Sequence, residues 1–438
     1  MLLMNNLFSK NFLYYSIILF PLTYVFGVFI TELFLGLIVI FFLIKNRNIK
    51  YFFDKKFIFL LLVSLYIGLN GFFQIDDNLK ISSIFHFRYI IFSLSILFCL
   101  EYFEKKEFSQ NKILLYSIFL FVFLILVDGI FQFFTGVNFF GYKIVQNRIS
   151  GIFGSELILG SFLTKILPIL TWLLFYYKFE IKKNQKKLII FFSLSLICIF
   201  LTAERTSLGL TLIYFILILI FIKPLKRIFL FSLIISFIFV CLVSTVQLGK
   251  TDPVNRIFIK TFNQFTNQYF VKNKTKKLLD EGFELDKDLI RNNILIFSKD
   301  HTGHFKLAFN LFKENPIFGV GPKGFRHHCR KVQYDPDIGI CSTHPHNFLV
   351  QIISETGLVG FLIYLYIILF IIFKLNKIRL IDNSSHIKRQ SLAIISIGLF
   401  INLFPFLPSG NFFNNWISII NYYYLGIYFY SYNKVYTQ

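Results

Sequence analysis

Two histidines near the start of an apolar stretch are the strongest candidates for chemistry in this sequence. His344 and His346 lie in STHPHNFLVQ (342–351), where a polar segment gives way to an apolar one, and Asn347 follows directly. Imidazole is the only side chain whose unperturbed pKa lies near working pH. His346 would therefore suit a general base at a hydrated membrane rim. A helix-capping or interfacial histidine would fit the same position, so both interpretations stay open.

Arginines near this histidine could bind a phosphate group. Arg88, Arg148, Arg205 and Arg326 lie at the ends of apolar segments or in polar connections. A guanidinium group stays charged and binds phosphate through paired hydrogen bonds. Two or three such groups would hold a lipid diphosphate and neutralise charge developing on a leaving group. Taken singly, Arg148 and Arg205 could instead extend to lipid headgroups.

The remaining polar residues near apolar segments favour structural roles. We expect Asp128 and Lys165, which lie at similar depth in two apolar segments, to pair with each other. Glu355 follows His346 by nine positions, which is about 900° on a continuous helix, so the two would face opposite ways. Gly357 and Gly360 are three apart, a spacing that permits close helix packing.

The elements that position these residues are predicted from the apolar content. The chain has 438 residues, of which 56% are apolar, against about 45–50% in soluble domains. This excludes an ordinary soluble domain and a disordered chain. A membrane-spanning helix needs about 20 apolar residues, and we find twelve candidate segments, near 12–28, 30–45, 57–74, 86–103, 112–134, 157–178, 186–203, 206–223, 228–246, 351–374, 389–407 and 413–431.

The distribution of charge predicts the orientation of these segments. The formal net charge is +22, with 45 Lys and Arg against 23 Asp and Glu. Most of the cations fall in every second connection, and the opposite short connections hold only Lys80, Lys143, Arg148 and Arg205. By the positive-inside rule both termini are cytoplasmic. The excess charge therefore reflects topology, and we do not expect nucleic acid as a partner.

The predicted fold is an all-α polytopic membrane protein with about twelve transmembrane helices and one large external loop. Residues 1–246 would form helices 1–9, residues 247–347 the loop with short amphipathic helices, and residues 348–438 helices 10–12. Within the loop, FKLAFNLF (305–312) has the periodicity of an amphipathic helix. No spacing of Cys and His residues is typical of a metal site.

A motif around His346 resembles the signature of a known family. The pattern H-[NSQ]-x9-G-x-x-G, formed by His346, Asn347, Gly357 and Gly360, resembles the O-antigen ligase superfamily, which includes O-antigen polymerases. The segments ENPIFGVGPKGF (314–325), NRISGIFGSE (147–156) and TAERTSLGL (202–210) are similar to it as well. The resemblance extends from about residue 110 onward.

The resemblance implies an inverting membrane glycosyltransferase that needs no metal or other cofactor. It would act in the bacterial inner membrane, with the large loop and active site at the periplasmic face, on a glycan carried by undecaprenyl diphosphate. His346 would be the catalytic base, and Arg148 and Arg205 the diphosphate clamps. Arg326 is a weaker candidate of our own, with His344, Asn347, Glu355 and Arg88 as supporting residues. The family's basic residue near the start of the loop helix is replaced here by His304, whose role is open.

Cys329 and Cys341 lie twelve residues apart in the loop. In an oxidising periplasm we expect them to form a disulfide that braces the segment before His344. Two unpaired cysteines are the alternative.

Three functions remain to be distinguished. The leading one is ligation of a polysaccharide from undecaprenyl diphosphate to lipid A-core. The runner-up is polymerisation, in which another lipid-linked repeat unit is the acceptor. The third is transport of a lipid-linked sugar, but transporters place polar sites near the midplane on paired repeats. Here the ionisable residues gather toward one side of the membrane, and we find no internal repeat.

Overall fold

The computed structural model describes residues 10–45, 55–74, 77–104, 112–246, 248–263, 299–329, 341–380 and 386–436. These residues form helices, with two isolated β-bridges in the connection between Val137 and Arg148. Several residues used in the topology argument, such as Arg47, Lys50 and Lys105, lie outside the described residues, as do 264–298 and 330–340 of the large loop.

The first part of the chain folds into helices that follow the predicted apolar segments. In a bilayer only helices and closed barrels satisfy every backbone hydrogen bond, which explains why these Leu-, Ile- and Phe-rich stretches are helical. The elements are α2 (Lys10–Leu19), η1 (Phe20–Phe26), α3 (Val28–Lys45), α4 (Lys55–Gln74), α5 (Asp77–Ile84), α6 (Phe87–Glu104), α7 (Ile113–Thr135), η4 (Gly151–Phe153), α8 (Leu159–Tyr176), α9 (Gln185–Leu201), α10 (Arg205–Phe221), η5 (Lys223–Leu225) and α11 (Lys226–Val246).

The rest of the chain begins with short elements and returns to long helices. The elements are the π-helix η6 (Asn255–Ile259), α14 (Lys299–Glu314), α15 (Phe325–His328), α16 (Phe348–Leu380), α17 (His386–Asn402) and α18 (Asn415–Tyr436). The amphipathic segment 305–312 lies within α14, so its helical prediction is confirmed. Leu307, Ala308 and Leu311 of this helix are buried in a small core.

Six helical segments are long and apolar enough to cross a membrane, within the described ranges. They are Val28–Lys45, Lys80–Glu104, Ile113–Thr135, Leu159–Tyr176, Lys223–Val246 and Phe348–Ile378. The predicted count of about twelve spans is not confirmed, because several other apolar helices are short. Helices α9, α10 and α17 have 17 residues each. The all-helical fold class is confirmed.

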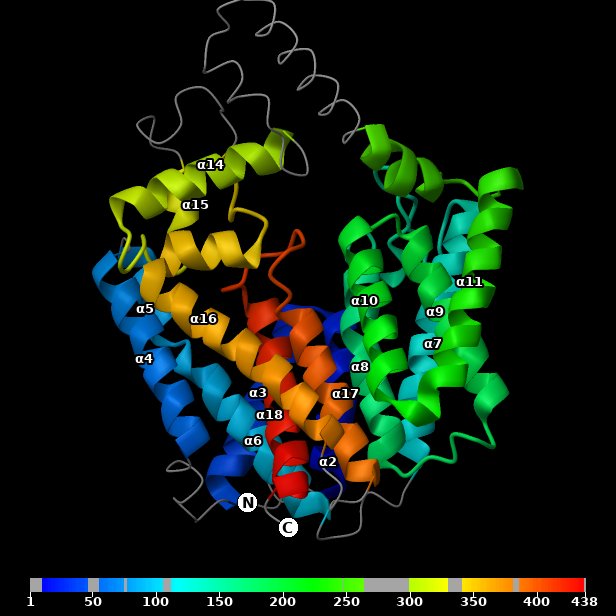
Figure 1. The fold of residues 1–438 in the computed structure, drawn as a ribbon, viewed down its shortest axis with the longest axis horizontal. Helices are drawn as coiled ribbons and strands as arrows, with labels where there is room; N and C mark the ends of the chain where they lie inside the picture. The colour runs from blue at the N-terminus through cyan, green and yellow to red at the C-terminus, as the bar shows by residue number, and fades with distance from the viewer. Residues whose placement is uncertain are drawn as a thin grey trace, which may run out of the picture.

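The helices pack as two groups joined through α8 and α17 (Figure 1). Helices α7, α9, α10 and α11 lie together on one side, and at the centre α18 packs against both α6 and α17. Helices α14 and α15 cover one end of the bundle, opposite the end at which α18 finishes. Every polar residue discussed as a site candidate comes from elements at the covered end.

Helix α16 is broken near its start, and this break shapes the covered end. Gly357 has φ +62° and ψ −164°, so the helix divides into a short piece before it and a long piece after it. A Cβ at Gly357 would lie 2.3 Å from the carbonyl oxygen of Ile317, so only glycine fits both the dihedrals and the contact. The spacing of Gly357 and Gly360 favours a packing role, and the structure shows a close approach at Gly357. Its partner is the backbone of the loop segment at Ile317 and Phe318.

Candidate functional site

His346 lies in the short connection that leads into α16. Its φ is +57°, a left-handed conformation that is uncommon outside glycine and that concentrates at functional sites. The backbone of Ser409 fixes this connection from the opposite side. The Ser409 amide donates to the His346 carbonyl (2.8 Å), and His344 Nε2 lies 3.2 Å from the Ser409 carbonyl oxygen. Because a carbonyl can only accept, His344 carries its proton on Nε2.

Four histidines gather around this connection. The His346 ring centroid lies 4.1 Å from that of His344, 5.2 Å from that of His304 and 5.8 Å from that of His301. Burial, followed by the nearby His304 and His301, lowers the pKa of His346 to about 4. Burial and His346 likewise lower the pKa of His344 to about 3. Both rings are therefore neutral near pH 7, and a neutral His346 can accept a proton.

His301 and His304 were not predicted to join this site. His304 stands where the family resemblance leads one to expect a basic residue, and the two histidines are one turn apart on α14. Residues three apart share one helix face, so this spacing could have predicted that both histidines face the same site. Throughout the part of the chain that the structure describes, no three His, Cys, Asp or Glu side chains are grouped to hold a metal ion.

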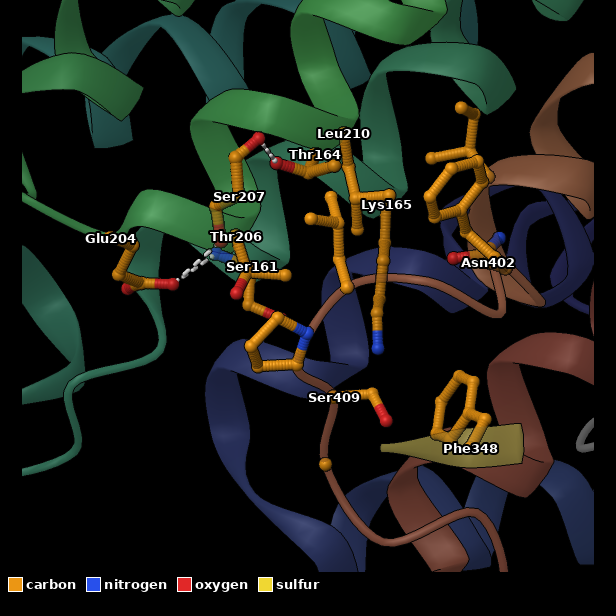
Figure 2. Close-up of a pocket in the computed structure, with 15 residues that line it drawn as sticks. Ser161, Thr164, Lys165, Glu204, Thr206, Ser207, Leu210, Phe348, Asn402 and Ser409 are labelled. Atoms are coloured by element: carbon orange, nitrogen blue, oxygen red, sulfur yellow. Dashed lines mark hydrogen bonds between the residues drawn. The ribbon is translucent and has the colours of Figure 1, made fainter. Parts of the chain in front are cut away.

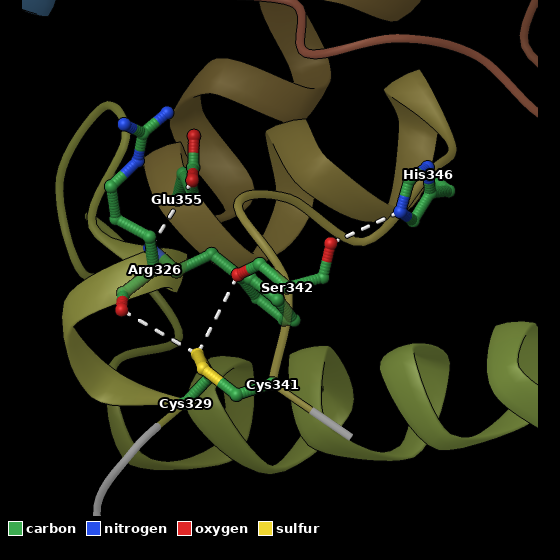
Figure 3. The surroundings of a disulfide bond; sticks show 7 residues. Arg326, Cys329, Cys341, Ser342, His346 and Glu355 are labelled. Atoms are coloured by element: carbon green, nitrogen blue, oxygen red, sulfur yellow. Dashed lines mark hydrogen bonds between the residues drawn. A yellow bond between two sulfur atoms is a disulfide. The ribbon is translucent and has the colours of Figure 1, made fainter.

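The residues that flank the histidines hold the connection in place. Cys329 and Cys341 form a disulfide with Cα atoms 5.3 Å apart, which ties α15 to the segment before His344 (Figure 3). Ser342, next to Cys341, places its Oγ 3.0 Å from His346 Nε2. Asn347 caps α16 through the Val350 amide and donates to the carbonyls of residues 405 and 407. The Asn347 side chain is therefore buried and hydrogen-bonded within the protein, and it supports the site by holding the connection in place.

Glu355 organises the glycine-rich turn rather than the histidines. Its carboxylate accepts from the amides of Lys323 (2.9 Å) and Phe325 (3.1 Å), and from Gln351 Nε2 (2.9 Å). Gln351 and Glu355, four residues apart, therefore share one face of α16. Glu355 is fully buried, so these donors are what compensate its desolvation. Among the described contacts it makes none with His346.

On the side of α15, Arg88 of the four predicted arginines lines a cavity of about 230 Å³. Arg88 and Lys323 line this cavity together with His86 and Tyr89. Arg88 Nη2 is already paired with Glu32 at 2.9 Å. Arg326 lies on α15 within electrostatic reach of His344 and Lys323, and its Nε is buried without a hydrogen bond to any described residue. Arg326 is therefore less occupied by protein partners than Arg88.

On the side of α8 and α10, Arg148 belongs to a buried ion pair. Its Nη2 lies 3.1 Å from Glu204 Oε1, and the two side chains are 14% and 11% exposed. Arg148 also donates to the carbonyls of Thr202 and Leu157. Arg205 is exposed at the first position of α10 and donates through Nε and Nη2 to the Arg256 carbonyl. The structure thus brings both predicted clamps to the α9–α10 turn.

A second cavity of about 240 Å³ opens beside this turn. It lies between α8, α10 and the segment after α17, and its lining includes Lys165, Glu204, Phe348, Asn402 and Ser409 (Figure 2). We call it the Lys165 cavity. Ser409 belongs both to this lining and to the hydrogen bonds that hold His344 and His346, so cavity and histidines share a wall.

The predicted pairing of Asp128 with Lys165 is wrong. The Asp128 carboxylate accepts from the Asn138 side chain (3.2 Å) and the Phe139 amide (2.9 Å), which lie in its own following connection. The two residues lie at similar depth in their helices, but their side chains do not point toward each other. Lys165 instead extends into the cavity.

The comparison with known families agrees with this arrangement. The chain has a bundle of apolar helices with polar groups gathered at one covered end, which is the architecture of a polytopic membrane enzyme. Residues 190–365 match the family model described as O-Antigen ligase, a segment that contains Arg205, Arg326, His346 and Glu355. The predicted resemblance to the O-antigen ligase superfamily is thereby confirmed over these residues, and the match supports an integral membrane enzyme of the ligase or polymerase type. No curated protein matches the chain.

Proposed function

We propose that this protein transfers a polysaccharide from undecaprenyl diphosphate to lipid A-core, as an O-antigen ligase. The observation that carries the proposal is His346, a neutral imidazole in a left-handed backbone conformation, which shares a wall with the Lys165 cavity. The family match over residues 190–365 supports the donor class.

In the proposed reaction, an acceptor hydroxyl attacks the anomeric carbon of the sugar attached to the diphosphate. His346 takes the hydroxyl proton, the new glycosidic bond forms, and the bond from carbon to diphosphate oxygen breaks. Undecaprenyl diphosphate leaves with the bonding electrons, and the anomeric configuration inverts. The proton-accepting atom would be Nδ1, with Nε2 donating to the Ser342 hydroxyl, because Nδ1 makes no hydrogen bond to any described residue.

Cationic groups would stabilise the charge on the leaving diphosphate. Arg326 is suited to contact it directly, since its Nε lacks a protein partner. Arg205 would contact it from the rim of α10. Arg148 would act through the Glu204 pair, and Arg88 through the pairing with Glu32. An anionic substrate near His346 would also raise its pKa toward the range that suits a base.

The proposal includes an orientation in the membrane. The chain would span the bacterial inner membrane with both termini in the cytoplasm and with α14 and α15 in the periplasm. The concentration of Lys and Arg in alternate connections supports this orientation. Residues 247–347 would form the periplasmic loop between helices 1–9 and 10–12, and its described part would recognise the acceptor.

A reconstituted reaction tests the acceptor. Purified protein in lipid nanodiscs would receive undecaprenyl-diphosphate-linked glycan with and without lipid A-core, and the lipid products would be separated by mass. Glycan on lipid A-core is the expected product. Longer glycans still attached to undecaprenyl diphosphate, formed without lipid A-core, would show a polymerase. Unmodified glycan that crosses the bilayer would show a transporter and would contradict the proposal.

A further inference from the structure

We infer that the Lys165 cavity binds the diphosphate of the lipid-linked donor, with the Lys165 ammonium as a further contact beside the arginines. This inference rests on the proposed function and adds a binding residue to it. The cavity is lined by side chains from α8, α10 and the segment after α17, three parts of the chain that are far apart in sequence.

Lys165 has no partner of its own. It lies about 9 Å along α8 from Leu159 at 1.5 Å per residue, and its ammonium makes no ion pair or hydrogen bond within the described part of the chain. Lys165 is half-buried, and an ionisable group inside a membrane bundle is by default a candidate for a functional site. In Figure 2 the side chain runs into the cavity with its nitrogen toward Ser409.

Two further polar groups in the cavity are incompletely satisfied. Asn402 is 5% exposed, and its carbonyl oxygen makes no hydrogen bond to a described residue. It lies beside the Tyr424 hydroxyl, which donates its proton to the Lys165 carbonyl. Tyr424 could thus accept from the Asn402 NH2 group but could not satisfy its carbonyl oxygen. The Ser409 Oγ is also buried without a partner among the described residues. A sugar attached to a phosphate presents hydroxyl groups and anionic oxygens that would satisfy such a set.

The charges around the cavity favour an anion. Glu204 is the only acidic residue among those that line it, and its carboxylate already accepts from Gly160, Ser161 and Ser207. It also pairs with Arg148, which stands behind it. Glu204 also lies within electrostatic reach of Lys165 without forming an ion pair with it. Because Arg148 neutralises Glu204, a net positive charge remains in the cavity for a ligand. The shared Ser409 wall brings that ligand next to His346, where transfer would occur.

Direct binding measurements would test this assignment. The full chain would be placed in phosphatidylcholine nanodiscs, and its affinity for undecaprenyl diphosphate would be measured beside that for undecaprenol, which lacks phosphate. The variants are Lys165→Met, Lys165→Arg and the matched control Lys143→Met, since Lys143 is exposed on the same predicted side. A charged hydrogen bond is worth enough for Lys165→Met to weaken diphosphate binding by about tenfold to a hundredfold. Undecaprenol binding and the control should be unchanged.

Thermal unfolding separates binding from folding. Removal of a half-buried charge that makes no ion pair should leave the Tm of Lys165→Met equal to or above the wild-type value, whereas a structural Lys165 would lower it. If the Met variant does not fold, Lys165→Arg decides, because it keeps the charge and should keep measurable diphosphate affinity. A second arm adds phosphatidylglycerol, and equal dependence on Lys165 for that lipid would show a general headgroup site.

The results distinguish this inference from the proposed function. Wild-type affinity in Lys165→Met, or no diphosphate binding by the wild-type chain, would overturn the inference even if transfer occurs. Diphosphate binding that depends on Lys165 without any glycan transfer would overturn the proposed function and leave the inference standing.

Discussion

The pair of Arg148 and Glu204 leads to a quantitative prediction about folding. Replacement of Arg148 by Ala would leave Glu204 buried at 11% exposure without its cation. Breaking a buried ion pair from one side typically costs about 3–5 kcal/mol. Glu204 would keep its hydrogen bonds from Gly160, Ser161 and Ser207. We therefore expect the lower end of this range, about 3 kcal/mol of unfolding free energy.

The assay is thermal unfolding of the purified protein in nanodiscs without substrate. Arg148→Ala should lower the Tm by several degrees. The matched control is Arg205→Ala, where the exposed side chain should change stability by about 1 kcal/mol or less. Donor binding measured on the same samples would show whether lost affinity in Arg148→Ala accompanies lost stability.

A pH series sharpens the test. Burial raises the pKa of the Glu204 carboxyl above its usual range, and the hydrogen bond from Ser207 and the Arg148 charge oppose that shift. Once Glu204 is protonated it no longer needs a cation, so the Tm difference between wild type and Arg148→Ala should shrink as the pH falls. A wild-type Tm for Arg148→Ala at pH 8 would refute the reasoning and favour a freely available phosphate clamp.

Two further predictions concern the histidines and the helix break. Because burial holds the pKa of His346 at about 4, the acid limb of kcat/KM should fall near pH 4; a limb near 6.5 would argue against His346 as the base. Gly357→Ala should destabilise by about 2–5 kcal/mol, from its dihedrals and from the 2.3 Å contact with the Ile317 oxygen. The control Gly36→Ala lies in α3 with open space around it and should be neutral or slightly stabilising; equal Tm values in the two variants would contradict the account of the break.

The positions of the long helices could be predicted because apolar runs in a membrane have few alternatives to a helix. The same argument located α14, where periodicity separates an apolar from a polar face. The lengths of the helices were less well predicted. Helices α9, α10 and α17 have 17 residues each, which is fewer than the about 20 that a membrane-spanning helix needs. The break in α16 could not be predicted, because the need for Gly357 comes from a backbone contact with Ile317, 40 residues earlier.

The candidate site was only partly predictable for a similar reason. His344, His346 and Asn347 are consecutive or nearly so, and their position next to an apolar segment is visible in the sequence. The partners of buried charges are not: Glu204 pairs with Arg148 across 56 residues, and Lys165 faces residues more than 200 positions later. Such pairings are decided by helix packing and side-chain direction, which residue spacing within one helix does not specify.

The measurement that tests the central claim most directly is glycan transfer by His346→Ala. Purified wild type, His346→Ala and the control His327→Ala, whose histidine is exposed on α15, would receive undecaprenyl-diphosphate-linked glycan and lipid A-core. Loss of a general base should slow transfer by about 10²–10⁴-fold, with donor affinity and Tm close to wild type and with the control fully active. Transfer at a near-normal rate by folded His346→Ala would contradict the role assigned to His346.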